Sequence, residues 1–267
     1  MTELRVLGEG PIEKMVASLG EPIEYHLPMG DQQIAINPLV GKAIALEFLG
    51  KISCVHCART TKKSFNQGYC YPCFSRLAQC DSCIVKPELC HYAEGTCREP
   101  TWGERNCMIP HTVYLANSSG LKVGITRGED PTTRWIDQGA AQGLAIRTVP
   151  NRLAAGNLEV ALKPFVADKT NWRKMLKGEP QELALDHERD RLVTLLREGS
   201  PEFELPGHQP DPAPAANLQY PVREFPEKVA SHNLDKKPEL KGQLNGIKGQ
   251  YLILDTAVIN LRKYGGY

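Results

Sequence analysis

The sequence predicts an α+β protein with β-rich ends, a cysteine-rich segment and a middle segment in which helices and strands alternate. Three observations support this prediction. All nine cysteines lie between Cys54 and Cys107. Both ends of the chain consist of short apolar runs separated by Gly and Pro. Residues from 111 onward switch between strand-like and helix-like patterns. A chain of 267 residues with 41% hydrophobic content can form two or three packed units.

The charge balance excludes a strongly basic, histone-like protein, because 32 Lys and Arg face 31 Asp and Glu. The charge is uneven along the chain: residues 111–178 carry ten basic and five acidic side chains, and residues 179–227 carry four and eleven. No apolar run approaches the roughly 18 residues of a transmembrane helix, and the first residues show no signal-peptide pattern. We therefore expect a cytoplasmic protein with a basic middle region that could meet phosphate.

Residues 1–53 form the first predicted part, which is β-rich, with strands at 34–36 and 43–52. Residues 220–267 form the last part, with strands at 220–222, 240–244, 249–255 and 257–261. Neither end holds enough strands for a stable separate sheet. We therefore expect the two ends to pack together as one β-rich domain, built as a small mixed barrel.

Residues 54–110 form the predicted cysteine-rich zinc-binding region. Cys54 and Cys57 are followed, after twelve residues, by Cys70 and Cys73. Two Cys-x-x-Cys knuckles supply the four thiolates of a tetrahedral zinc site. Clustered cysteines in a chain without an export signal are typical of metal ligands and not of disulfides. We expect a structural zinc ion here, because four thiolates leave no open coordination position.

A second group of thiols follows the first within the same region. The simplest ligand set is Cys80, Cys83, Cys90 and Cys97, in which Cys107 or His91 could replace one member. Thiolate ligands suit both zinc and an iron–sulfur cluster, so the metal at this set stays open. The segment is rich in turns and poor in apolar residues. Metal binding should therefore supply much of its folding free energy.

Residues 111–200 form the predicted α/β core. Residues 112–116 and 121–125 are two apolar runs separated by Asn-Ser-Ser-Gly, which indicates a hairpin. Asp130 and Pro131 mark the start of a helix over 131–141. A strand at 145–149 and helices at 152–166, 169–177 and 186–197 follow. Residues 201–219 are Pro-rich and indicate a linker.

The core resembles the GIY-YIG nuclease superfamily, in which two strand triplets, a helix arginine and a later glutamate form the active site. Thr112-Val113-Tyr114 corresponds to the first triplet and Lys122-Val123-Gly124 to the second. Arg134 and Glu159 correspond to the arginine and the glutamate. The likeness is divergent, because Thr112 replaces a glycine and Lys122 replaces a tyrosine.

The chain also resembles an uncharacterised bacterial family of unknown function. The motifs that carry this likeness are Cys-His-Tyr at 90–92, His111-Thr-Val-Tyr114, Arg134-Trp-Ile-Asp-Gln-Gly139 and Thr170-Asn-Trp-Arg173. This second resemblance implies no mechanism.

The first resemblance implies phosphodiester chemistry. Tyr114 would help to activate water, Lys122 and Arg134 would hold phosphate, and Glu159 would bind Mg²⁺ or Mn²⁺. The residues that we expect to contact substrate are Arg127, Asn171 and Arg173.

The sequence as a whole predicts a zinc-containing protein that binds or processes nucleic acid, with divalent-metal-dependent endonuclease activity as its strongest form. Two alternatives remain open. One is a catalytically inactive GIY-YIG-like module that only binds nucleic acid. The other is a zinc scaffold whose acidic residues 179–227 contact protein partners. The sequence does not distinguish DNA from RNA.

Overall fold

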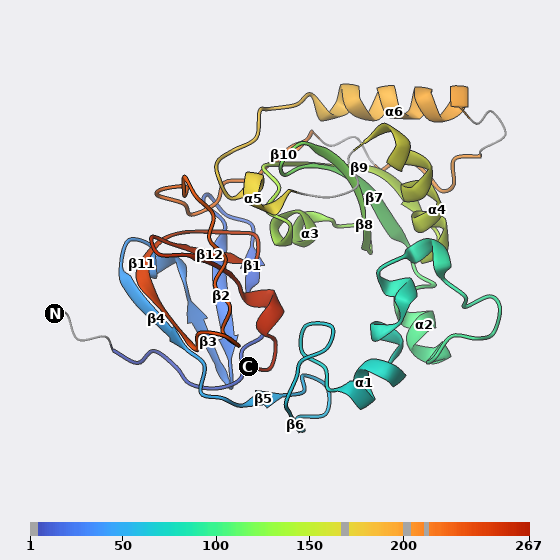
Figure 1. Cartoon of the computed structure of the whole chain (residues 1–267). Helices are drawn as coiled ribbons and strands as arrows, with labels where there is room; N and C mark the ends of the chain where they lie inside the picture. Colours follow the sequence, from blue (N-terminus) through green and yellow to red (C-terminus); the bar gives the residue numbers. More distant parts are fainter. Residues whose placement is uncertain (1–4, 167–170, 200–203, 211–213) are drawn as a thin grey trace. The chain divides into compact units, whose positions relative to one another are not determined.

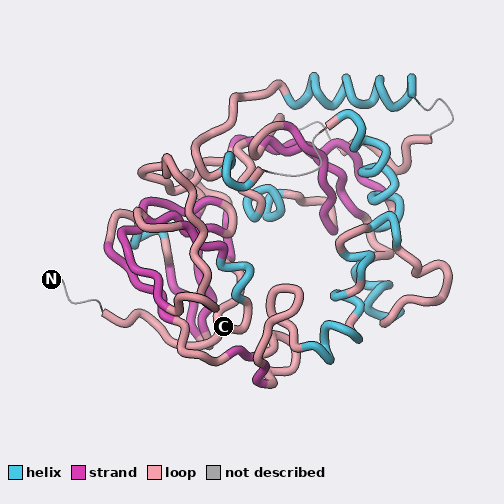
Figure 2. Tube along the Cα trace, viewed as in Figure 1, coloured by secondary structure: helices cyan, strands magenta, loops and turns pink. Residues whose placement is uncertain are grey.

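The computed structural model describes residues 5–166, 171–199, 204–210 and 214–267 (Figures 1 and 2). Helices and sheets are mixed along the chain, which confirms the α+β class. The chain forms two compact units. Unit 1 runs to Ser75 and includes Leu176–Gly178 and Gln219–Tyr267, and unit 2 comprises Arg76–Met175 and Glu179–Leu218.

Unit 1 begins with a three-stranded antiparallel sheet in the order β1-β2-β3. Tyr25 and Leu27 alternate with more exposed neighbours along the central strand, so one face of the sheet is buried. The elements are β1 (Val16–Ser18), β2 (Glu24–Met29), β3 (Gln32–Ala35) and the 3₁₀ turn η1 (Asn37–Leu39).

The second sheet of unit 1 joins the two ends of the chain. Its order is β13-β12-β11-β4, so an N-terminal strand pairs with the C-terminal hairpin. Leu244, Ile253 and Ile259 are fully buried in it. The expected strand at 220–222 contributes only an isolated bridge between Val222 and Gly246. The elements are β4 (Ala43–Glu47), β11 (Glu239–Lys248), β12 (Tyr251–Leu254), β13 (Val258–Asn260) and η6 (Leu261–Tyr264).

The described strands of unit 1 therefore form two open antiparallel sheets and a short two-stranded sheet of residues 52–53 and 60–61, in place of the single small barrel that we expected. The first cysteine set lies in this last part of the N-terminal segment of unit 1. Its elements are β5 (Ile52–Ser53), β6 (Thr60–Thr61) and α1 (Tyr71–Arg76).

Unit 2 is built on a four-stranded antiparallel sheet in the order β10-β9-β7-β8. The predicted hairpin is confirmed, with Tyr114 paired to Gly124 across its two strands. The short strand β10 comes from the predicted linker and pairs with β9. The strands are β7 (His111–Asn117), β8 (Leu121–Arg127), β9 (Gln142–Val149) and β10 (Ala216–Asn217).

Helices cover both faces of this sheet, with α6 above it and α3 below it in Figure 1. Side chains of α4 and α6, including Leu158 and Leu192, pack with Val113 and Leu115 of β7 in one hydrophobic core. Asn151 caps α4, because its Oδ1 accepts a hydrogen bond of 2.9 Å from the Ala154 N–H. The helices are α3 (Thr132–Asp137), α4 (Arg152–Leu162), η5 (Lys163–Phe165), α5 (Trp172–Met175) and α6 (Leu185–Gly199).

Three of these helices differ in length from the prediction. Helix α3 is shorter than 131–141, because the chain turns at Gly139, which has a φ of 67°. The expected helix at 152–166 ends in the 3₁₀ turn η5. The expected helix at 169–177 starts among residues outside the described ranges, and its described part is α5.

The second cysteine set lies in a segment made of short turns, which packs beside α4. Its elements are η2 (Ala78–Cys80), η3 (Ser82–Ile84), η4 (Pro87–Leu89) and α2 (Pro100–Asn106). None of the helices in the described ranges has the length and apolar content needed to cross a membrane.

Candidate metal centre and candidate active site

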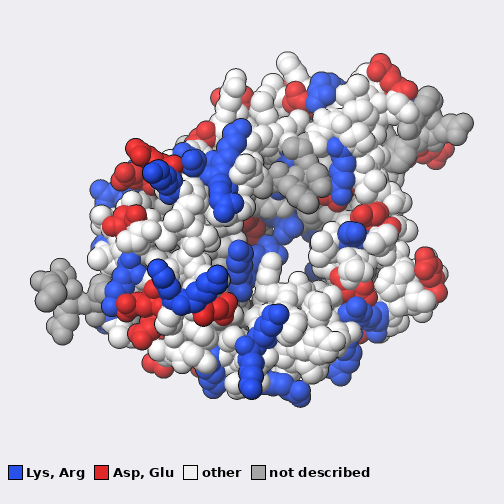
Figure 3. Space-filling model, in the orientation of Figure 1, with Lys and Arg blue, Asp and Glu red and all other residues white. Residues whose placement is uncertain are grey.

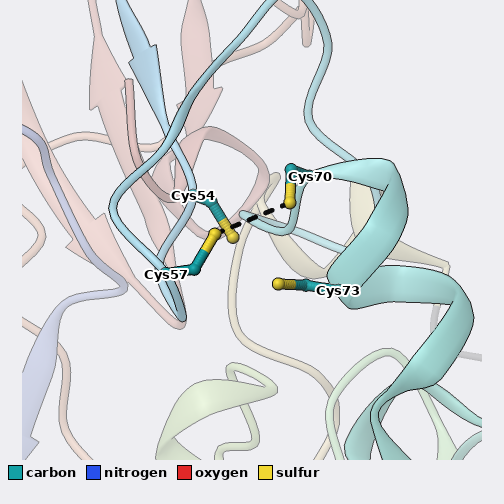
Figure 4. Close-up of side chains that lie close together, drawn as sticks. All are labelled: Cys54, Cys57, Cys70 and Cys73. Carbon is teal, nitrogen blue, oxygen red and sulfur yellow. Dashed lines mark hydrogen bonds between the residues drawn. The ribbon is translucent and has the colours of Figure 1, made fainter.

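The first cysteine set assembles as the sequence predicted. The Sγ atoms of Cys54, Cys57, Cys70 and Cys73 all lie within 4.8 Å of one another (Figure 4). The sulfurs of Cys57 and Cys70 are 3.8 Å apart. Zn–S bonds of about 2.3 Å in a tetrahedron separate the sulfurs by roughly 3.8 Å. The spacing of these thiols therefore suits a single zinc ion.

Local backbone structure positions these thiols. Cys54 follows β5, and its N–H and C=O bond to Arg59 and Ala58 at 2.9 and 2.8 Å, which closes the first knuckle. Cys70 precedes α1, and its C=O accepts from the Phe74 N–H at 2.9 Å. None of the nine cysteines is in a disulfide. The thiols are therefore available as ligands.

The closeness of these four thiols shifts the pKa values of two of them. Burial would raise the pKa of Cys54, but hydrogen bonds from the backbone of Cys70, Cys57 and His56 outweigh it and lower the pKa. Burial and the neighbouring thiols raise the pKa of Cys73. A divalent cation between the four sulfurs would favour the thiolate form of each. The donor set thus fits a structural zinc ion.

The second cysteine set corresponds to the alternative that the sequence left open, in which Cys107 takes the place of one member of the simplest four. Cys83, Cys90 and Cys97 line one cavity, and the fourth thiol in its wall is Cys107. Cys80 is buried but does not belong to the lining of this cavity. His91 and Asp81 also lie close to Cys83, because their ligand atoms are within 4.8 Å of its sulfur.

A second candidate site lies on the sheet of unit 2, where the side chain of Tyr114 on β7 lies over Gly124 of the neighbouring strand β8. A Cβ added to Gly124 would stand 2.6 Å from the Tyr114 hydroxyl oxygen, so only glycine leaves room for this ring. The ring of Trp135, from α3, meets the Tyr114 ring edge-on with centroids 6.2 Å apart. The Trp135 ring in turn covers Gly143 of β9. Gly124 is therefore needed at this position so that the Tyr114 ring can pack against the strand.

Lys122 lies on the same face of the hairpin as Tyr114 and is only 8% exposed. Burial, followed by the positive charge of Arg134, lowers the pKa of Lys122 to about 8. The carboxylate of Glu159 acts in the opposite direction. Burial raises the pKa of Tyr114, and its hydroxyl faces Arg134 and Gln138 without completing a hydrogen bond.

Arg134 and Glu159 thus act electrostatically on both Tyr114 and Lys122, and we call these four residues the cationic cluster. Tyr114 and Lys122 are buried, whereas Arg134 and Glu159 are partly exposed at its edge. Gln138 is an additional member that the sequence did not indicate, because a single glutamine after a helix carries no recognisable signal.

The other predicted substrate contacts are more scattered. Arg127 ends β8, far from Lys122, and its Nε donates to the Asn106 carbonyl at 2.9 Å. The Asn171 N–H donates to the Ser119 hydroxyl at 2.9 Å, beside the turn that precedes Lys122. Arg173 is exposed and stacks on the Trp172 ring at 4.3 Å. Asn171 thus lies near the turn that precedes Lys122, whereas Arg127 lies at the opposite end of β8.

Comparison with known proteins gives one match. A family model described as "Protein of unknown function (DUF2797)" matches residues 41–267. The matched range contains both cysteine sets and the cationic cluster, and it starts after β3. No curated protein and no solved structure matches the chain.

Proposed function

The chain belongs to the DUF2797 family of unknown function, and we propose that it is a zinc-containing protein that binds nucleic acid at the cationic cluster. The excess of positive charge at that cluster carries the proposal. Lys122 and Arg134 repel each other, and the carboxylate of Glu159 partly offsets this repulsion. A bound phosphate group would favour the protonated form of Lys122 and reduce this repulsion. The cluster is therefore suited to an anion.

The residue types fit a phosphodiester. The Arg134 guanidinium offers a planar fork to two phosphate oxygens, and Lys122 offers a compact point charge. In this proposal unit 2 has a GIY-YIG-like fold, and Asn171 and Arg173 extend the binding site. Reduced thiolate ligands suit a cytoplasmic location.

The surface charge explains why the proposal rests on a small cluster and not on a broad patch. Basic and acidic side chains are interspersed over the face shown in Figure 3. We therefore expect modest affinity and a shallow dependence on salt, because few phosphates would be neutralised.

Binding can be tested by fluorescence anisotropy with labelled single-stranded DNA, duplex DNA and RNA at several salt concentrations. Lys122→Met and Arg134→Gln should each weaken binding by about tenfold and reduce the salt slope by about 1. Lys228→Met and Arg105→Gln remove exposed charges elsewhere and serve as matched controls. Absence of binding to all three probes, or equal affinity of site and control variants, would contradict the proposal.

Phosphodiester cleavage is a second candidate function, which the electrostatic influence of the Glu159 carboxylate on Lys122 and Tyr114 favours. A carboxylate such as Glu159 can hold Mg²⁺ or Mn²⁺, and such an ion would stabilise charge on the phosphate. In this version Tyr114 orients the attacking water, and Lys122 and Arg134 hold the phosphate oxygens.

Cleavage is tested by nicking of labelled DNA and RNA with Mg²⁺ or Mn²⁺. Glu159→Gln should abolish nicking, whereas Glu182→Gln, an exposed control, should not change it. Wild-type protein that binds a probe but never nicks it would end the catalytic version and leave the binding function standing.

A further inference from the structure

We propose that Cys83, Cys90, Cys97 and Cys107 are the four thiolate ligands of an iron–sulfur cluster of the [4Fe–4S] type. This second metal centre lies in unit 2, is separate from the zinc knuckles and does not depend on nucleic-acid binding. It excludes Cys80, although Cys80 and Cys83 have the Cys-x-x-Cys spacing.

The four thiols surround one cavity. Each of them lines it, and the remaining wall is mainly apolar, with Ala78, Ile84 and Trp102 among its residues. Cys83 and Cys107 are buried, and Cys90 and Cys97 are partly buried. Electrostatic interactions link Cys107 to both Cys90 and Cys97, and Cys83 to both Cys90 and Cys107. The four sulfurs therefore face a common space.

The spacing of the sulfurs distinguishes this site from the zinc knuckles. All four sulfurs of the first set lie within 4.8 Å of one another, but Cys90, Cys97 and Cys107 do not form such a group. A cube of four irons and four sulfides holds its thiolates farther apart than a single ion does, and it needs space between them. Thiol sulfurs that lie farther apart around a cavity therefore favour an iron–sulfur cluster over a single zinc ion.

The chain positions of the ligands agree with this distinction. Zinc knuckles supply ligands in closely spaced pairs. Here Cys83 lies in η3, Cys90 follows η4, Cys97 precedes α2 and Cys107 follows it. Each ligand thus comes from a separate turn.

The competing ligands near Cys83 already have partners. Arg98 Nε lies 2.7 Å from a carboxylate oxygen of Asp81, and the Ser82 hydroxyl donates to its other oxygen at 3.1 Å. His91 bonds through Nδ1 to the Thr96 hydroxyl at 2.7 Å, and its Nε2 lies 3.6 Å from Asp81. Both side chains are held in a polar network, which leaves the thiols as the ligands.

Arg152 supplies positive charge beside the thiols. It begins α4 and is only 9% exposed, and its guanidinium donates to the carbonyls of Cys83 and Ile84 at 3.2 and 2.5 Å. Cys107, Cys83 and Cys90 interact electrostatically with this guanidinium, and their thiols would be anionic as metal ligands. A buried guanidinium needs such partners. Four thiolates around a [4Fe–4S] core retain net negative charge, which Arg152 would balance.

The test is metal and sulfide analysis of the full chain, produced with adequate iron and purified without oxygen. We expect about four irons and four acid-labile sulfides per chain, with broad visible absorption from sulfur-to-iron charge transfer. Cys90→Ser and Cys107→Ser should lose the iron and this absorption. Cys80→Ser should keep both, and Cys57→Ser should lose zinc while keeping iron.

The wild-type result is decisive even if a ligand variant fails to fold. Wild-type protein without iron and sulfide, or with two zinc ions per chain, would overturn the proposal. Equal loss of iron in Cys80→Ser and Cys107→Ser, with both variants folded by circular dichroism, would overturn the ligand assignment.

Discussion

Lys122 is a residue at which this chain differs from the GIY-YIG pattern that it resembles. The proposed likeness to GIY-YIG proteins predicts a tyrosine at this position, whereas this chain has a buried lysine on which the charges of Arg134 and Glu159 act. A buried ammonium has a desolvation cost that a phenol would not have. The substitution therefore turns a neutral position into a cationic one, and we connect this change with anion binding.

The burial of Lys122 predicts a pH dependence of stability. Its pKa is about 8 in the folded chain and 10.5 when unperturbed. The unfolded chain binds more protons between these two values, so the contribution of Lys122 to stability rises with pH across this window. Below about pH 8 the protonated group costs about 3 kcal/mol, and Lys122→Met should raise the unfolding free energy by up to that amount.

Urea unfolding of wild type, Lys122→Met and Lys228→Met from pH 7 to 10 checks this prediction. The stability difference between wild type and Lys122→Met should shrink as the pH rises, while Lys228→Met follows wild type. A difference that stays constant over the whole range would show that Lys122 does not titrate in this window.

At the scale of elements, the zinc knuckles hold a segment that has almost no core of its own. Strands β5 and β6 are two residues each, and α1 has six. Such elements are too short to be stable alone. Zinc affinity at this site should therefore appear as folding free energy of the segment.

Cys57→Ser should consequently release one zinc ion per chain and make residues 54–75 sensitive to limited proteolysis. The sheet that contains β4 and β11 should resist the protease, because its buried residues, such as Leu244 and Ile253, do not depend on zinc. Zinc content and the cleavage sites can be measured by mass spectrometry. Zinc retained in Cys57→Ser would contradict the predicted ligand set.

At the scale of the whole molecule, residues far apart in the sequence stabilise the same unit. The buried side chain of Gln250 accepts a hydrogen bond from the Met15 N–H at 2.8 Å and donates one to the Met15 carbonyl at 2.9 Å. The side-chain amide thus pairs with the backbone of a residue 235 positions away. It connects the N-terminal segment to the C-terminal hairpin within unit 1.

Gln250→Ala should lower the unfolding free energy by about 2–4 kcal/mol, because two buried backbone groups lose their partners. Gln243→Ala is the matched control, since Gln243 is exposed, and its removal should cost less than about 1 kcal/mol. Urea unfolding measures both. Equal effects of the two substitutions would mean that water replaces the lost hydrogen bonds of Met15.

The sequence by itself determined the features that depend on local spacing. Two Cys-x-x-Cys pairs indicated four thiols that could bind zinc, and two short apolar runs around a polar turn indicated the β7–β8 hairpin. These predictions succeed because the spacing that defines a knuckle or a hairpin is contained in a few consecutive residues.

Only the tertiary structure decided the features that depend on contacts between distant segments. It selected Cys107 over Cys80 in the lining of the second cavity, paired β4 with β11, and brought Glu159 of α4 within electrostatic range of Lys122 of β8. Each of these depends on how separate turns, strands and helices pack, and the free energy of packing belongs to residues that are neighbours in space and not in sequence.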